Sequence, residues 1–216
     1  MIKQYFTGAL TTLLFCYSFS VCAQQTLPEN TIELRIELDR INFELKDDIR
    51  DERLALMVDH MNKLAEQHSQ NPEYLMLAGF FNIQYASNTG GLGALKYAKA
   101  ARNYLNQSIA IDPTIYGASA HAVLGRIYTS IPGWPLAFGD KKKGEMNMLK
   151  AIEISPDGMD SNITYASYLL EEKQFSKARH YLLKAQQSPA RPNREKADEE
   201  LHKLINEKLK EIEHTR

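Results

Sequence analysis

The sequence predicts an all-α protein built from antiparallel helix pairs. Apolar residues recur at intervals of three and four along nearly the whole chain beyond residue 23, and no segment alternates convincingly as a strand would. A pattern of small, large apolar and small residues also ends at a proline three times between residues 101 and 189. Such repetition indicates a stack of similar helix pairs.

The first 23 residues have the order of a secretory signal peptide. Lys3 precedes an apolar run over about residues 5–21, and Val21 and Ala23 stand three and one positions before a cleavage site. The run is short for a membrane span and lacks a basic stop-transfer cluster, which argues against a transmembrane anchor. We therefore expect export to the periplasm, cleavage after about Ala23, and one mature domain over residues 24–216.

The positions of the two cysteines support export. Cys16 and Cys22 both lie in the signal segment, so cleavage would leave no thiol for disulfides, nucleophiles or metal ligands. Lipidation of Cys22 is the alternative, although Val21 and Phe19 fit a lipobox poorly. Loss of Lys3 would change the net charge from −1 to −2. A surface so near neutrality predicts neither nucleic-acid binding nor firm membrane contact.

Two helices are expected before the repeats. The first follows the capping residue Asn30; residues 32–38 alternate as a strand would, but the longer pattern up to Leu45 is helical. The second covers about residues 48–68. The pair Asn71–Pro72, a cap and a proline in the first turn, then begins the next helix.

From residue 72 onward the chain repeats itself. The expected repeats cover about residues 72–113, 114–156 and 157–189, each with two helices and a closing proline. The second helices share small, large and small residues at intervals of four and three: Ala101, Leu105 and Ser108; Gly144, Met148 and Ala151; Ala178, Leu182 and Ala185. Small residues at this spacing allow two antiparallel helices to approach closely.

These positions resemble the tetratricopeptide repeat, in which Leu-Gly-x-x-Tyr on one helix precedes Ala-x-x-x-Phe-x-x-Ala and a proline on the next. Residues 124–128 are the closest copy of the first half, and residues 178–185 of the second. The resemblance implies a tetratricopeptide-like α-solenoid. The interval from Ala101 to Gly144 is longer than the ordinary repeat, so the earlier repeats are expected to carry insertions.

A narrower resemblance covers about residue 72 to the C-terminus. The segment Ile131–Lys141, with the run that follows it to Pro156, is similar to the T component of TRAP transporters and to its free-standing bacterial relatives. This resemblance implies a periplasmic helical protein associated with a solute-binding component. It also implies an internal channel or pocket.

The segment 130–140 is the richest candidate for a binding site. Its prolines and glycines exclude regular structure, whereas Trp134 and Phe138 are too apolar for a simple solvated connection. Either these side chains plug back into the helical core, or they line a binding site with Tyr128 and His121 nearby. A small-ligand pocket roofed by the Trp134 loop is therefore an alternative to a protein-binding surface.

A second insertion is expected at residues 86–96, which include three glycines. It interrupts its repeat at the equivalent place, so both insertions should emerge at one edge of the stack and together form a rim. The segment is not a phosphate-binding loop, because Tyr97 follows Lys96 where Ser or Thr would be needed. A flexible turn is the simpler interpretation.

Three consecutive lysines begin the helix that follows the Trp134 loop. Asp140 is the expected N-cap, which places Lys141, Lys142 and Lys143 where the helix dipole is already positive. Either the lysines are solvated, at a cost of about a few tenths of a kcal/mol each, or an anionic ligand or partner binds there.

The remaining polar residues form no catalytic constellation, and no metal or cofactor site is expected. The six histidines show no pair at metal-ligand spacing, and His121 is interpreted as a core or groove residue. Arg191, Arg194 and Asp198 open the last helix, where a charge pair across one turn is the ordinary interpretation. That helix, about residues 193–213, should cap the stack with a charged outer face and bury three leucines: Leu201, Leu204 and Leu209.

The sequence therefore predicts a binding or scaffold protein rather than an enzyme. Its expected partner is a protein or peptide held in the concave face of the stack. The resemblance to the T component narrows this partner to a periplasmic solute-binding protein, in a TRAP-like solute uptake system. The alternative is a small-ligand carrier whose pocket lies under the Trp134 loop.

Overall fold

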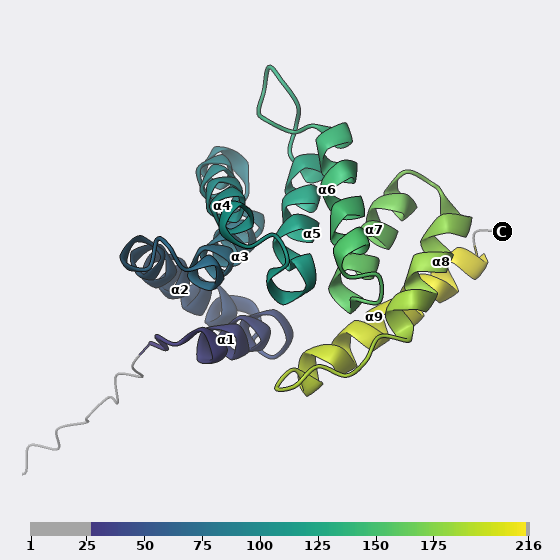
Figure 1. Ribbon diagram of the computed structural model, residues 1–216, viewed down its shortest axis with the longest axis horizontal. Coiled ribbons are helices and arrows are strands. Elements are labelled where there is room, and N and C mark those ends of the chain that lie inside the picture. The colour runs from purple at the N-terminus through teal and green to yellow at the C-terminus, as the bar shows by residue number, and fades with distance from the viewer. Residues whose placement is uncertain (1–26, 215–216) are drawn as a thin grey trace, which may run out of the picture.

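The computed structural model describes residues 27–214, except for the side chain of Leu92, and this part of the chain is built from helices without a β-strand (Figure 1). The expected all-α class is confirmed. The predicted signal segment, with both cysteines, lies outside the described residues. None of the described helices is long and apolar enough to cross a membrane. The helices are α1 (Thr31–Phe43), α2 (Asp47–Gln67), α3 (Pro72–Thr89), α4 (Gly91–Ile111), α5 (Ile115–Ser130), α6 (Lys141–Ile154), α7 (Met159–Glu171), α8 (Phe175–Gln186) and α9 (Glu195–His214).

Three helices begin at the side-chain caps that the sequence predicts. Asn30, Asn71 and Asp140 each accept a hydrogen bond from a backbone N–H two or three residues further on, at 2.9 to 3.0 Å between nitrogen and oxygen. Pro72, which has no N–H to satisfy, is the first residue of α3. These caps satisfy donors that the first turn of a helix cannot, so the starts of α1, α3 and α6 are fixed locally.

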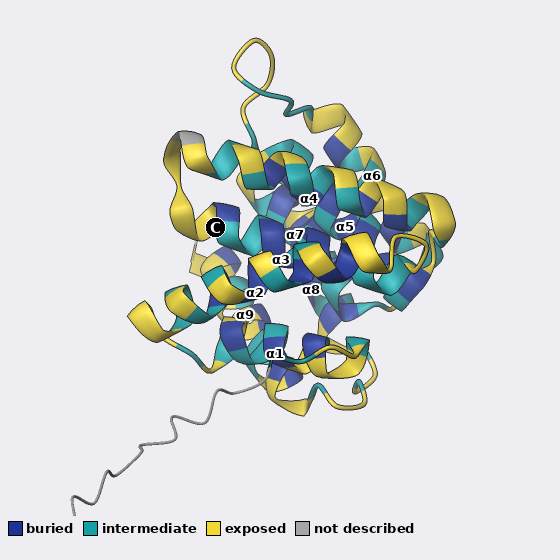
Figure 2. Ribbon diagram, turned by 90° about the vertical axis from the view of Figure 1, so that its left-hand side faces the viewer, coloured by how far each residue is buried: buried dark blue, intermediate teal, exposed yellow. Residues whose placement is uncertain are grey.

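The expected helix pairs are α3–α4, α5–α6 and α7–α8, which follow one another in a solenoid-like stack (Figure 1). All nine small and large residues that repeat along the second helices are buried. One core cluster joins α1 to α5, and a second joins α6 to α9. Figure 2 shows the buried residues concentrated where the helices face one another.

Helices α5 and α6 touch through their backbones. A Cβ atom added to Gly125 would lie 2.7 Å from the carbonyl oxygen of Gly144. One added to Gly144 would lie 2.8 Å from the carbonyl oxygen of Gly125. Real Cβ atoms do not approach an oxygen so closely, so two glycines are needed at this crossing.

The insertion expected at residues 86–96 is not a loop, which corrects the predicted rim. Helix α3 continues to Thr89 and α4 begins at Gly91, so the extra residues lengthen the two helices to 18 and 21 residues. Gly90 and Gly91 reverse the chain between them with positive φ angles of 67° and 59°. Continuous i to i+4 hydrogen bonding satisfies the backbone that a loop would leave to water.

Helix α9 packs against α8 and also reaches α1 at the other end of the stack (Figure 1). The expected capping helix is therefore present; two of its three predicted core leucines, Leu201 and Leu209, pack against the core, and Leu204 does not. Ile205 and Ile212 are fully buried, whereas Leu204 is 36% exposed. Leu201 and Leu209 are only partly buried.

The close crossing of α5 and α6 gives a stability prediction. Gly125→Ala should lower the free energy of unfolding by about 1–3 kcal/mol, because the new methyl group forces the two backbones apart. Urea unfolding followed by circular dichroism measures this change.

Gly93→Ala is the matched control for this substitution. Gly93 is also helical, but its added Cβ would meet only Thr89 at an ordinary 3.6 Å. The control should be neutral or stabilise the protein by up to about 1 kcal/mol, because alanine is the better helix former. Equal effects at both positions would contradict the proposed contact.

Candidate functional site

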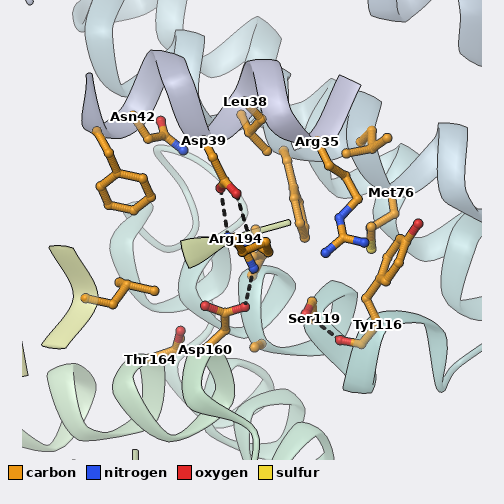
Figure 3. A pocket seen from close by; sticks show the side chains of 16 residues that line it. Arg35, Leu38, Asp39, Asn42, Met76, Tyr116, Ser119, Asp160, Thr164 and Arg194 are labelled. Carbon is orange, nitrogen blue, oxygen red and sulfur yellow. Dashed lines mark hydrogen bonds and ion pairs between the residues drawn. The ribbon is translucent and has the colours of Figure 1, made fainter. Parts of the chain in front are cut away.

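One arginine joins the two ends of the helix stack. Arg194, just before α9, donates two parallel hydrogen bonds to the carboxylate of Asp39 on α1, each 2.8 Å between nitrogen and oxygen (Figure 3). Its remaining terminal nitrogen donates to Asp160 on α7 at 3.1 Å. Asp39 and Arg194 are 155 residues apart in the sequence. The stack is therefore closed into a ring by a charge-assisted, bidentate contact.

Arg191 extends this contact into a network. Its guanidinium donates to Asp160 and Asp198, and its backbone N–H donates to Asp198 at 2.9 Å. The two arginines thus share Asp160. The side chains of Arg194, Asp39 and Asp198 are only 18%, 15% and 10% exposed. Burial opposes the charge on Arg194, but hydrogen bonds and charge from Asp39 and Asp160 outweigh it and raise the pKa of the guanidinium above its usual value.

The closed ring encloses a cavity of about 230 Å³, which we call the inner cavity. It lies between α1, α3, α5, α7 and the start of α9 (Figure 3). One part of its wall is apolar and consists of Leu38, Phe43, Met76, Leu77, Phe80, Ala122, Val123 and Leu201. The rest is polar and consists of Arg35, Asp39, Asn42, Tyr116, Ser119, Asp160, Thr164 and Arg194.

A wider cavity of about 580 Å³, the vestibule, adjoins the inner cavity. Five residues line both, and we call them the neck: Arg35, Tyr116, Ser119, Asp160 and Arg194. Two further cavities of about 310 Å³ continue the series. One shares four residues with the vestibule, and the other shares Val123 and Thr164 with the inner cavity. These four adjoining cavities, which we call the hollow, lie along α3, α5 and α7.

Tyr116 reaches the neck from an unusual backbone conformation. Tyr116, Gly117 and Ala118 have φ angles of 46°, 63° and 61°, so the first turn of α5 is left-handed. A bulky residue rarely adopts this conformation, which costs about 1–2 kcal/mol per residue. Ser119 supports the turn by donating its hydroxyl to the carbonyl of Tyr116, at 2.7 Å. Strain of this kind persists where surrounding structure requires it and often accompanies functional sites.

The guanidinium of Arg35 lies over the ring of Tyr116, 3.9 Å from its centre. This is a cation–π contact between α1 and the start of α5. Burial raises the pKa of the Tyr116 phenol, and a hydrogen bond to Glu73 acts in the same direction, whereas Arg35 opposes them. The phenol therefore remains protonated at neutral pH.

The Trp134 loop, residues 131–140, projects from the helices and contributes to none of these four cavities (Figure 1). Its two aromatic residues, Phe138 and Trp134, lie in different surroundings. Phe138 packs back, as one interpretation expected: its ring meets Tyr128 edge-on at 6.2 Å, and Arg102 covers it at 4.3 Å. Trp134 instead is 89% exposed at the tip. The expected pocket under Trp134 is thus not where the hollow lies.

Two of the three lysines after Asp140 lie beside carboxylates of the same chain. Lys141 forms an ion pair with Glu172, between α7 and α8, which raises the pKa of its ammonium group. Lys143 lies 4.0 Å from Asp140, and Lys142 is exposed. Acidic side chains thus reduce the conflict with the helix dipole without a ligand.

His121 is half-buried, as the groove interpretation requires, and lies outside the four cavities. Its Nδ1 is 3.0 Å from the amide oxygen of Asn147 on α6, so this nitrogen is the donor. This contact joins α5 to α6. No group of three or more His, Cys, Asp or Glu side chains within residues 27–214 is arranged to hold a metal ion.

Sequence reasoning missed the neck. Asp198 pairs with Arg191, seven residues away, rather than across one turn as expected, and this pair is one edge of a network whose other members come from α1 and α7. Nothing in the sequence near Arg194 indicates Asp39. The best available signal was two arginines three positions apart beside a proline, ahead of a helix of mixed charge.

A comparison of the sequence with known protein families and with curated proteins found no match. The fold and the cavity must therefore carry the functional argument.

Removal of the bridging arginine should destabilise the closed ring. Arg194→Met leaves the carboxylate of Asp39 buried without its partner, so we expect a loss of about 3–5 kcal/mol in the free energy of unfolding. Amide hydrogen exchange in α1 should accelerate in proportion to that loss of stability. Asp39→Leu in the same background should recover part of the loss, because it removes the unpaired charge.

Lys150→Ala is the control for this experiment. Lys150 forms an exposed ion pair with Glu153 on the same helix, and such pairs contribute at most about 0.5 kcal/mol. If Arg194→Met were as mild as this control, the bridge would not hold the two ends together.

Proposed function

We propose that the protein is an exported, non-enzymatic binding protein that carries a small ligand in its inner cavity. The observation that supports this most directly is the closure of the helix stack by Arg194 around a partly apolar hollow. A concave, mostly apolar pocket with a few convergent polar groups is the usual form of a small-molecule site. The signal-like first 23 residues support export.

The dimensions of the hollow fit a small ligand. The inner cavity, at about 230 Å³, has room for several water molecules. It is slightly smaller than the roughly 300–1,000 Å³ of pockets for drug-sized molecules, while the vestibule provides further space outside the neck. A compact ligand that is apolar at one end and polar at the other suits this division.

A cavity-filling substitution tests this function. Val123 lies where the inner cavity meets the next cavity, and Val123→Phe adds bulk there. Native mass spectrometry of protein purified from the cell envelope should show a small bound mass that is released on unfolding. We expect at least a tenfold lower occupancy in Val123→Phe, since the phenyl ring occupies ligand space.

Leu136→Ala is the control, because Leu136 is 79% exposed on the Trp134 loop and remote from the cavities. It should retain full occupancy. A folded Val123→Phe protein with unchanged occupancy would show that the ligand binds elsewhere. Intrinsic fluorescence is a poor reporter for this experiment, because the single tryptophan of the sequence is Trp134.

The Trp134 loop supports a second function, the docking of a partner protein. Trp134 and Leu136 are 89% and 79% exposed. The loop is nevertheless held by two backbone hydrogen bonds, from the N–H of Gly139 to the carbonyl of Pro132 and from the N–H of Asp140 to the carbonyl of Tyr128, both 2.9 Å between nitrogen and oxygen. Exposed tryptophan on an ordered loop is typical of binding hot spots. The resemblance to the T component of TRAP transporters favours a periplasmic solute-binding protein as the partner. A carrier and its partner could then exchange the ligand.

Truncation of the tryptophan tests the docking function. Trp134→Ala should weaken capture of a partner from an envelope extract at least 30-fold, as for a hot spot of about 2 kcal/mol or more. Occupancy of the inner cavity should not change. Phe138→Leu is expected to lower stability instead, because Phe138 anchors the base of the loop. Unaltered capture by Trp134→Ala would exclude the loop as the docking surface.

A further inference from the structure

Arg35 is the one arginine at the neck without a carboxylate partner among the described residues. Arg194 donates to Asp39 and Asp160, and Arg191, just beyond the neck in the vestibule wall, donates to Asp160 and Asp198. Arg35 contacts both the ring and the phenol of Tyr116 and forms no ion pair within residues 27–214. A guanidinium carries five N–H donors in a planar fork. Donors at the neck thus remain available to a ligand.

Two of the three carboxylates around Arg35 are already used. Asp39 and Asp160 accept from the two bridging arginines, whereas Glu73 lies beside the phenol of Tyr116 in the vestibule wall. The charges of these groups nearly balance those of the arginines, so no strong field selects the ligand. The unused hydrogen-bond donors of the Arg35 guanidinium select the ligand instead. A ligand that binds there must supply hydrogen-bond acceptors.

The walls on the two sides of Arg35 differ in polarity. The apolar wall of Leu38, Met76, Leu77 and Phe80 belongs to the inner cavity alone. Glu73, Arg191 and Asn193 line the vestibule and not the inner cavity. A molecule whose polar end lies at Arg35 can therefore place its apolar end against the apolar wall of the inner cavity. The opposite orientation would move a charged head group away from Arg35 and towards that wall.

We infer that the ligand is an amphipathic anion, with an oxyanion head group bound by Arg35 beside Tyr116 and an apolar body in the inner cavity. This inference rests on the proposed carrier function. A carboxylate, sulfonate or phosphate can accept two parallel bonds from the guanidinium fork, which gives both affinity and orientation. Tyr116 supports the guanidinium through the contact with its ring, and the left-handed first turn of α5 positions Tyr116 for that contact.

A matched series of eight-carbon compounds tests the inference by isothermal titration calorimetry. The series is octanoate, octane-1-sulfonate, octan-1-ol, octanamide and octylamine, each titrated into the whole exported protein after removal of any bound molecule. We expect the two anions to bind at least tenfold more tightly than the alcohol and the amide. Arg35→Met should abolish that margin and leave the affinity for the alcohol unchanged.

Arg40→Met is the matched control, since Arg40 lies on the same helix but is 41% exposed and outside the hollow. It should keep the preference for the anions. Tyr116→Phe removes only the phenol hydroxyl and should keep most of the preference, because the ring face remains under Arg35. If Arg35→Met does not fold, Arg35→Lys should reduce the margin severalfold, since the ammonium group keeps the charge and loses the fork.

The possible results separate the two proposals. Equal binding of the acid and the alcohol, or preferred binding of the amine, overturns the anionic head group and leaves a carrier of a different ligand. An anion preference that persists in folded Arg35→Met also overturns the role of Arg35. Failure of every compound to bind contradicts the carrier function itself.

Discussion

The contact of Arg194 with Asp39 and Asp160 is the constraint on which the rest of the structure depends. An array of helix pairs has two open ends, and each pair contacts only its neighbours. Here the segment before α9 returns to α1, so the first and last elements share a charge network. Replacement of buried ion networks by apolar residues is often neutral in stability, so the role we expect for this one is to specify a position more than to supply energy. It determines where α9 lies.

The position of α9 in turn creates the hollow. The inner faces of α3, α5 and α7 would form an open concave surface without a wall on the remaining side. Arg194 and Leu201 supply part of that wall, and Arg35 and Leu38 supply part of the opposite one from α1. The same arginine thus closes the ring and contributes to the neck, while Arg35 beside it remains free of acids. In the proposed function, structure and recognition are divided between two arginines of the same neck.

Most of the helical framework could be predicted from the sequence. The caps at Asn30, Asn71 and Asp140 are local signals. The small residues of the second helices indicate that the two helices of each pair approach closely, wherever the pairs stack. The site could not be predicted in this way, because Asp39 and Arg194 are distant in the chain and their pairing depends on the cumulative rotation of every helix between them. Trp134 and Lys141 are chemically conspicuous in the sequence, but their side chains lie outside the hollow. Gly90 and Gly91 are ambiguous in the sequence, because a sharp reversal between two long helices uses the same residue type as a flexible loop.

The closed ring has a consequence for how such a chain can change. Open solenoids lengthen and shorten readily by gain or loss of a repeat, because a new unit alters only its two neighbours. In this protein an added helix pair would rotate and displace α9 away from α1, so Arg194 would lose Asp39 and the hollow would open. The number of repeats is therefore as tightly fixed as any residue of the site. Variation is confined to what can grow outward from the ring, and the projecting segment between α5 and α6 is an example of such growth.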